Sequence, residues 1–195
     1  MASTSIEDYI KNIYHLQAEK KTVNTGTLAT VLNVSPASVS EMVSKLSRSG
    51  YIKNIPYKGF TLTGSGEKIA VSLIRKHRLI EVFLLERLNY RWEDVHGEAE
   101  KFEHVCSDVF INKLDKYLGF PRKDPNGDTI PDKFGNIKTS NTKQLAKAEM
   151  GKNYVISKVN DTSTEVLKYI SSIGIKLKTK IKLVEKLSFD NSLLV

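Results

Sequence analysis

The chain of 195 residues is 40% hydrophobic and 27% charged, an ordinary globular composition that can supply one sizeable core or a few small ones. Cys106 is the only cysteine, which excludes an internal disulfide framework and fits a reducing cytoplasm. No apolar run approaches the roughly 18 residues of a membrane helix, and the formal net charge of +8 favours an anionic partner such as nucleic acid.

Three helices are predicted in the first part of the chain. The first begins at Ser5, a residue suited to capping a helix. A short helix follows within residues 25–34, and a third begins at Pro36, with Ser35 as its N-cap, and ends at Gly50. Two short helices with a tight turn between them, the second rich in small polar residues, are typical of a helix-turn-helix.

A β-hairpin is predicted next, with its turn at residues 56–59. After three helices, such a hairpin indicates the wing of a winged-helix DNA-binding domain. The alternative is a small helical domain that happens to end in a hairpin. The residues expected to bind DNA are Ser35, Ala37, Ser38, Ser40 and Glu41 in the major groove, and Lys45, Arg48 and Lys58 at phosphates.

Two longer helices are predicted in the middle of the chain, over residues 64–90 and 92–120. The charge balance changes here, from 7 Lys and Arg against 4 Asp and Glu in residues 1–63 to 9 against 10 in residues 64–118. On the first of these helices, His77 and Glu81 are four residues apart and share a face. The second is expected to bury one apolar face, formed by Val95, Ala99, Phe102, Cys106, Val109, Phe110 and Leu114.

A polar stripe runs along the second of these helices, within about a third of its circumference at about 100° per residue. Its members are His96, Glu100, Glu103 and His104. The glutamates repel one another unless a cation is bound, and carboxylate with imidazole suits divalent transition metals. The stripe therefore predicts a metal site. The alternatives are a solvated helix face and acid/base catalysis, but no nucleophile motif or Gly-rich phosphate loop accompanies it, so we expect no enzyme activity.

Five segments of the chain together resemble the diphtheria toxin repressor and manganese transport regulator family. They are EDYIKNIYHL, LNVSPASVSEMVSKLSRSGYI, GFTLTGSGEKIA, IRKHRLIEVFLLERL and VHGEAEKFEHVCSD. The resemblance implies a mainly α protein with a small C-terminal β region. The implied parts are a winged helix-turn-helix domain at 1–63, a helical metal-binding and dimerisation domain at 64–120, a linker at 121–150 and an SH3-like (FeoA-type) domain at 151–195.

The resemblance also implies two metal sites. The family's primary, activating site is matched by Asp8, Glu100, Glu103 and His104, and its ancillary site by His77, Glu81 and His96, with Asp161 as a candidate further ligand. Iron-responsive members have methionine and cysteine where this chain has Asp8 and Glu100. Hard oxygen donors at these positions favour Mn²⁺, with Fe²⁺, Co²⁺ and Zn²⁺ as alternatives.

The chain departs from its relatives at two places. Lys11 stands where shorter manganese regulators have an acidic ligand, which favours two separated metal sites over a closely spaced pair. Some longer manganese regulators have a Cys-Pro-His ligand loop, whereas this chain offers Asp124 and Asn126, so we do not expect the same loop to bind metal in the same way.

The C-terminal residues 151–195 alternate between apolar and polar side chains around one short helix, which predicts β-strands. They resemble the start of an SH3-like barrel. The sequence stops where such a barrel needs more strands, so we expect a barrel that is truncated or completed by another segment.

Together these features predict a cytoplasmic, Mn²⁺-responsive transcriptional repressor. The resemblance alone implies that its targets are metal-uptake genes. We expect it to bind double-stranded operator DNA as a homodimer when metal-loaded, with no membrane partner and no organic substrate. Two alternatives stay open at this stage: an iron-responsive repressor of the same family, and a winged-helix regulator controlled by a small organic ligand.

Overall fold

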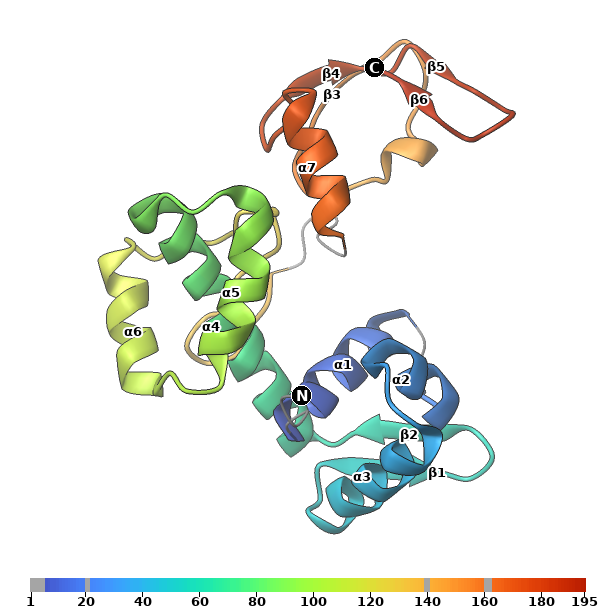
Figure 1. The fold of residues 1–195 in the computed structure, drawn as a ribbon, viewed down its shortest axis with the longest axis vertical. Helices are drawn as coiled ribbons and strands as arrows, with labels where there is room; N and C mark the ends of the chain where they lie inside the picture. The colour runs from blue at the N-terminus through green and yellow to red at the C-terminus, as the bar shows by residue number, and fades with distance from the viewer. Residues whose placement is uncertain (1–5, 20–21, 139–140, 160–162) are drawn as a thin grey trace. The chain divides into compact units, whose positions relative to one another are not determined.

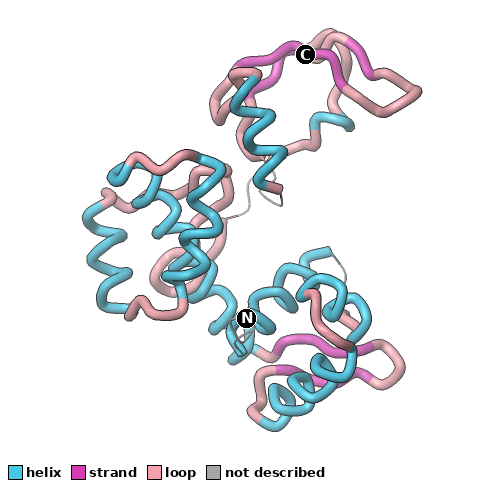
Figure 2. The backbone as a smooth tube through the Cα atoms, viewed as in Figure 1, coloured by secondary structure: helices cyan, strands magenta, loops and turns pink. Residues whose placement is uncertain are grey.

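The computed structural model describes residues 6–19, 22–138, 141–159 and 163–195. They belong to two compact units, one comprising Met1–Lys76 with Lys133–Gly135 and the other His77–Asp132 with Asn136–Val195. Helices dominate, and strands occur only in one hairpin of the first unit and in the C-terminal region of the described chain (Figures 1 and 2). No helix in the described ranges combines the length and apolar character needed to cross a bilayer. The fold is mainly α, as predicted.

The first unit is a winged helix-turn-helix (Figure 1). Its elements are α1 (Ile6–Glu19), α2 (Thr25–Leu32), α3 (Pro36–Arg48), β1 (Ile52–Ile55), β2 (Gly59–Leu62) and the beginning of α4 (Gly64–Leu88). The predicted order of three helices and a hairpin is therefore confirmed. Ser5, the expected cap of the first helix, lies outside the described residues.

Local signals in the sequence fix the tight turn between α2 and α3. Asn33 ends α2 in the left-handed conformation, with φ 53°, which an asparagine adopts more readily than most residues. The side chain of Ser35 then accepts a hydrogen bond from the Ser38 amide, and Pro36 occupies the first helical position. The N-cap predicted for the third helix is confirmed.

The wing is fastened to the helices of its own unit. β1 and β2 pair antiparallel, with Ile52 opposite Leu62. Val23 exchanges two backbone hydrogen bonds of 2.9 Å with Phe60, and the Leu62 amide donates to Gln17 Oε1 of α1 at 2.7 Å. The shared core is built from fully buried side chains, among them Ile10, Ile13, Leu28, Val39 and Leu46.

The second unit contains the rest of α4 and a set of shorter elements. These are the 3-10 turn η1 (Trp92–Asp94), α5 (Val95–Glu103) and α6 (Asp108–Tyr117). The single helix expected over residues 92–120 is thus wrong. Ser107 breaks it, because its side chain caps α6 by accepting a hydrogen bond from the Phe110 amide at 3.2 Å.

This break also changes which side chains are buried. Val95, Ala99 and Leu114 lie in the core, as predicted. Phe102, Val109 and Phe110 were expected there too, but they are between 43% and 68% exposed. The restart of the helix at Ser107 turns Ile111 and Leu114 inward and leaves the other side of α6 on the surface.

Residues 121–132 form an ordered loop within the second unit, although their composition indicated part of a linker. The C-terminal elements are η2 (Leu145–Lys147), β3 (Asn153–Val155), α7 (Thr164–Ser172), β4 (Lys180–Lys182), β5 (Glu185–Lys186) and β6 (Leu193–Leu194). β3 pairs with β4 and β5 with β6, both antiparallel, and Leu167 and Leu183 are buried. Strands around one short helix are therefore present, as predicted.

Candidate metal centre and DNA-binding surface

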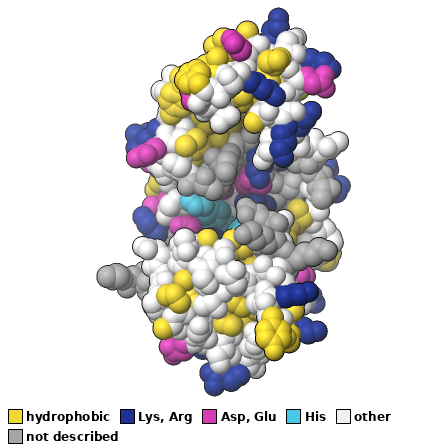
Figure 3. Space-filling model, turned by 90° about the vertical axis from the view of Figure 1, so that its right-hand side faces the viewer, with side chains coloured by type: hydrophobic (Ala, Val, Ile, Leu, Met, Phe, Trp, Pro, Cys, Tyr) yellow, Lys and Arg dark blue, Asp and Glu magenta, His cyan; other side chains and the backbone are white. Residues whose placement is uncertain are grey.

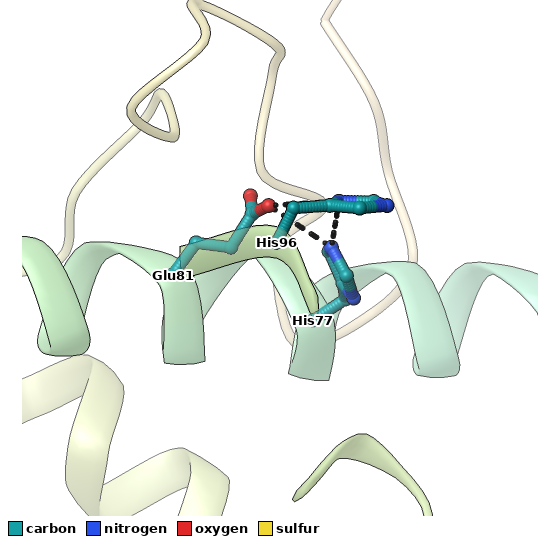
Figure 4. A group of neighbouring side chains, drawn as sticks. All are labelled: His77, Glu81 and His96. Atoms are coloured by element: carbon teal, nitrogen blue, oxygen red, sulfur yellow. Dashed lines mark hydrogen bonds and ion pairs between the residues drawn. The ribbon is translucent and has the colours of Figure 1, made fainter. Parts of the chain in front are cut away.

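Three potential metal-ligating side chains converge in the second unit (Figure 4). His77 and Glu81 project from successive turns of α4, and His96 reaches them from the beginning of α5. His77 Nε2 lies 3.0 Å from Glu81 Oε1 and 3.0 Å from His96 Nδ1, and His96 Nδ1 lies 3.2 Å from Glu81 Oε1. The three atoms thus form a nearly equilateral triangle.

These spacings fit a divalent metal. Ligands on adjacent corners of an octahedron lie about 3.0 Å apart when each metal–ligand bond is about 2.1 Å. The second carboxylate oxygen of Glu81, Oε2, is buried and has no hydrogen-bond partner among the described residues. A buried oxygen of this kind costs free energy unless a cation or donor satisfies it. The residues therefore fit a metal ion.

Electrostatics keeps Glu81 in its ligating form. Burial raises the pKa of this carboxyl. Hydrogen bonds and positive charge from His77 and His96 outweigh the effect of burial and lower the pKa to about 2. Glu81 is therefore an ionised carboxylate at neutral pH, although its side chain is only 1% exposed. A buried anion of this kind requires a nearby positive charge.

Glu103 links this triangle to the other predicted ligands. It is fully buried, and its Oε2 lies 2.5 Å from His77 Nδ1. When His77 Nδ1–H donates to this carboxylate, the lone pair of Nε2 is left for a metal. Glu103 Oε1 lies 3.5 Å from His104 Nε2, and His96 Nε2 lies 3.7 Å from Glu100 Oε1.

All six ligands predicted on α4, on α5 and at the C-cap of α5 therefore belong to one connected cluster. On the face drawn in Figure 3, histidine side chains gather at one place with acidic side chains beside them. Asp8, the seventh expected ligand, is a half-buried residue of α1 in the first unit. Asp161 lies outside the described residues. Cys106 is partly buried and packs against the apolar core of the second unit, in agreement with its interpretation as a core residue.

Asp124 and Asn126, whose role the sequence left open, hold the 121–132 loop together. Asp124 faces Arg78 and is 5% exposed. Burial raises the pKa of Asp124 to about 7, and the negative charge of Glu81 adds to this shift while Arg78 opposes it. Neither Arg78 nor Trp92, which donates to Asn126, stood out in the sequence, since each finds its partner more than 30 residues away.

The first unit presents the predicted DNA-binding residues to solvent. On α3 and its cap, the exposed members are Ser35, Ala37, Ser38, Ser40, Glu41, Lys45 and Arg48. Lys58 is exposed at the tip of the wing, beside Tyr57, whose φ of 62° shows a tight turn. The residues are therefore placed on the accessible side of a helix-turn-helix and on a basic wing tip.

Family models match three consecutive parts of the chain. The N-terminal DNA-binding domain of iron-dependent repressors matches residues 1–60. The metal-binding and dimerisation domain of the same repressors matches residues 63–132, and the FeoA domain matches residues 143–195.

Curated relatives are similar over the first two of these parts. An uncharacterised HTH-type transcriptional regulator of Methanocaldococcus jannaschii is 38% identical over 60% of this chain and 94% of its own length. The HTH-type transcriptional regulator MntR of Oceanobacillus iheyensis is 35% identical over 64% of this chain and 84% of its own. The iron-dependent repressor IdeR of Mycobacterium tuberculosis is 36% identical over 64% of this chain, which spans 54% of that relative.

Solved structures extend the similarity to nearly the whole chain. A manganese-dependent transcriptional repressor in complex with manganese has a TM-score of 0.87 and 36% identity, covering 95% of this chain and 86% of the other. The manganese regulator SloR has a TM-score of 0.78 and 37% identity, covering 97% of this chain and 92% of the other.

Proposed function

The chain belongs to the iron-dependent repressor family of metal-dependent transcriptional regulators, and from this premise we propose that it represses metal-uptake genes when loaded with Mn²⁺. The observation that carries the proposal is the triangle of His77, Glu81 and His96, whose atoms have the spacing of ligands around one ion. As a regulator of genes, the protein acts on DNA in the cytoplasm.

The proposed metal-binding residues fall into two sets. His77, Glu81 and His96 hold the ancillary ion, with Asp161 as a further ligand. Glu100, Glu103 and His104 hold the activating ion together with Asp8, as the sequence resemblance implies. A bound cation neutralises these carboxylates and fixes the elements that carry them. Because Asp8 belongs to the DNA-binding unit, the activating metal then links metal supply to DNA binding.

Mn²⁺ is the proposed metal because the deciding donors are hard. Asp8 and Glu100 offer carboxylate oxygen rather than thioether or thiolate sulfur, and oxygen ligands suit Mn²⁺. Fe²⁺ is the alternative supported by the similarity to IdeR. Co²⁺ and Zn²⁺ are competitors in solution, because most sites bind them more tightly than Mn²⁺.

The proposed active form is a homodimer on operator DNA. The second unit exposes large apolar side chains from α5, from α6 and from the turn between them, namely Phe102, Val105, Val109, Phe110 and Tyr117. Exposed apolar surface of this kind favours a subunit interface. A two-fold dimer sets its two recognition helices about one DNA turn apart, roughly 34 Å.

Equilibrium dialysis tests the metal-binding part of the proposal. We expect the wild-type protein to bind Mn²⁺, and His96→Ala to lose at least about tenfold in affinity for one ion because it removes one corner of the triangle. His15→Ala is the matched control, since His15 is an exposed residue of α1 outside both proposed sites. Equal Mn²⁺ binding by both variants would contradict the proposed ancillary site.

A DNA-binding titration then identifies the activating metal. Operator binding is measured at defined free concentrations of Mn²⁺, Fe²⁺, Co²⁺ and Zn²⁺, and Mn²⁺ activation is expected at the concentrations available to a cell. Operator binding that is the same with and without every one of these metals would favour a regulator controlled by an organic ligand.

A further inference from the structure

The loop of residues 123–129, here called the clamp loop, is held in shape by Asp124. The Oδ1 atom of Asp124 accepts hydrogen bonds from the amides of Asn126 and Asp128, each at 2.9 Å. The Gly127 amide donates to the Asp124 carbonyl at 3.1 Å. Asp124 and Asn126 are 5% and 0% exposed, so the centre of the loop is folded and buried.

Arg78 fastens the clamp loop to α4. Its Nε lies 3.3 Å from Asp124 Oδ2, its Nη1 donates to the Thr129 carbonyl at 2.5 Å, and its Nη2 lies 3.5 Å from Asp128 Oδ1. One guanidinium therefore contacts two carboxylates and one carbonyl. Arg78 directly follows His77, so the helix that carries the proposed ancillary ligands also carries the anchor of the loop.

The clamp loop in turn holds a distant stretch of the chain, residues 157–159. The Val159 amide donates to the Asn126 carbonyl at 2.9 Å, and Lys158 Nζ lies 2.6 Å from Asp128 Oδ1. Lys123 Nζ donates to the Ser157 carbonyl at 3.3 Å. These contacts join the loop after α6 to the segment that precedes α7.

Gly127 is required for this approach. Its φ is 90°, and a Cβ atom at this position would lie 2.2 Å from the Ser157 carbonyl oxygen. That distance is far inside van der Waals contact with backbone, so any side chain here forces residues 157–159 away from the loop. Gly151 has a similar φ of 78° but open space around the place of its Cβ.

The polar groups of the clamp loop that could ligate a metal are engaged by protein donors. Asp124 is engaged by two amides and Arg78, Asp128 by Arg78 and Lys158, and Asn126 Oδ1 by the indole N–H of Trp92 at 2.7 Å. A guanidinium and an ammonium thus lie against the two acidic side chains of the loop, at the places that a bound cation would take.

We propose that the clamp loop is a metal-independent docking seat for residues 157–159, anchored by Arg78, which attaches the C-terminal region to the metal-binding unit. Arg78, Asp124 and Asn126 are positioning residues in this arrangement, and they bind no ion. The attachment persists in the metal-free protein, so metal acts on a molecule whose C-terminal region is already seated. This goes beyond the proposed function and does not depend on it.

Hydrogen exchange of the metal-free full-length protein tests the seat at a single atom, the Val159 amide. We expect this amide to be protected in wild type and to exchange at least about tenfold faster in Gly127→Ala. Gly151→Ala is the matched control: it places the same side chain at a similar φ without the clash, and should leave the protection of Val159 unchanged. Adding Mn²⁺ should change the wild-type protection less than about twofold.

Trp92 provides a second readout, because it is the only tryptophan in the chain and it bonds to the clamp loop. In Arg78→Met, we expect its emission to shift to longer wavelength as the loop opens and water reaches the indole. Circular dichroism confirms that each variant is folded, and Gly127→Ala decides the matter if Arg78→Met does not fold.

Three results would overturn the proposal. They are a Val159 amide unprotected in the metal-free wild type, protection that appears only on adding Mn²⁺, and equal protection in Gly127→Ala and Gly151→Ala. Failure to bind Mn²⁺ would instead contradict the proposed function, so the two failures are distinguishable.

Discussion

At the scale of single residues, Glu103 is a buried carboxylate that lies between two histidines. It is completely buried, with one carboxylate oxygen directed at His77 and the other near His104. Those two histidines belong to the two different proposed metal sites. One buried carboxylate is thus placed to orient a ligand of the proposed ancillary site and to serve the proposed activating site, so we expect loss of its charge to affect both.

Glu103→Gln tests this shared role. The substitution keeps the size of the side chain but removes the charge, so His77 is oriented less firmly and one donor is weakened. We expect Mn²⁺ affinity to fall at least about tenfold, equivalent to about 1.4 kcal/mol, in equilibrium dialysis. Glu98→Gln on the same helix, where the acid pairs with Lys101 near the surface, is the control and should bind as wild type. Unchanged affinity in Glu103→Gln would assign this carboxylate a purely structural role.

Metal preference is also decided by single residues. The double substitution of Asp8→Met with Glu100→Cys keeps the number of donors but replaces hard oxygen with soft sulfur. We expect activation to shift from Mn²⁺ toward Fe²⁺ or Co²⁺, measured as the free metal concentration that gives half-maximal operator binding. If the order of metal potencies stays that of the parent protein, donor softness does not determine selectivity.

At the scale of elements, the sequence predicted those whose signals are local. Ser35 and Pro36 mark the beginning of α3 by side-chain chemistry alone, and the structure confirms both. The division between α5 and α6 was missed, because the apolar periodicity of residues 92–120 continues through it. Ser107 followed by Asp108 was the available signal, since a serine before an acidic first turn is a typical helix start.

The exposed side chains of α6 show a different limit of sequence-based prediction. Val109 and Phe110 follow the pattern of a core face, and a single sequence does not distinguish the core of one chain from the interface of two. The clamp loop shows a third limit. Its composition of Asp, Pro, Asn and Gly is that of a linker, while its stability depends on Arg78, more than 40 residues earlier.

The wing provides a prediction at this scale. Lys58→Ala should weaken binding to all DNA sequences and flatten the log–log salt dependence by about one unit, because one phosphate contact is lost. Lys113→Ala removes the same charge from an exposed position of α6 and should leave the salt slope unchanged. Substitutions of Ser38 or Glu41 should alter the preference among operators instead. If the salt dependence of DNA binding has the same slope in Lys58→Ala as in wild type, Lys58 does not contact the DNA backbone.

The exposed side of α6 provides another prediction at the scale of elements, concerning the dimer interface. Val109 is 68% exposed, so Val109→Glu should leave the isolated chain folded while placing two charges in a two-fold interface. We expect the dimer dissociation constant to rise at least about tenfold in sedimentation experiments, a change of about 1.4 kcal/mol. Val184→Glu, at an exposed position of the C-terminal region, is the control. Equal association of both variants would place the interface elsewhere.

At the scale of the whole molecule, composition indicated only part of the organisation. A basic first part and a histidine- and acid-rich middle suggested two functions on one chain, whereas the SH3-like C-terminal region was implied by the family resemblance together with the alternation of residues 151–195. What composition did not predict was how the C-terminal region is attached. That depends on pairs such as Asn126 with Val159, which bring together residues far apart in sequence.

A prediction at the scale of the whole molecule concerns the coupling between metal binding and operator binding. If metal binding favours the form that binds operator, then operator binding favours metal by the same factor. Chelation should therefore weaken operator affinity at least about tenfold, or about 1.4 kcal/mol, in fluorescence anisotropy. Added operator should raise the affinity for Mn²⁺ equally in dialysis. Unchanged DNA affinity after verified metal removal would contradict coupling, even in a protein that binds metal.

The hydrogen bond from the Leu62 amide to Gln17 has a consequence for the order in which such a repressor binds its operators. Through it, and through the pairing of Val23 with Phe60, α1 and the wing belong to one tightly bonded body that also contains α3. A displacement of α1 is therefore expected to move α3 and the wing as one body, without changing the shape of the proposed DNA-binding surface. A rise in free metal concentration would then strengthen binding at every operator by the same factor. The order in which genes are repressed would be set by the relative affinities of their operators and would not depend on the metal supply.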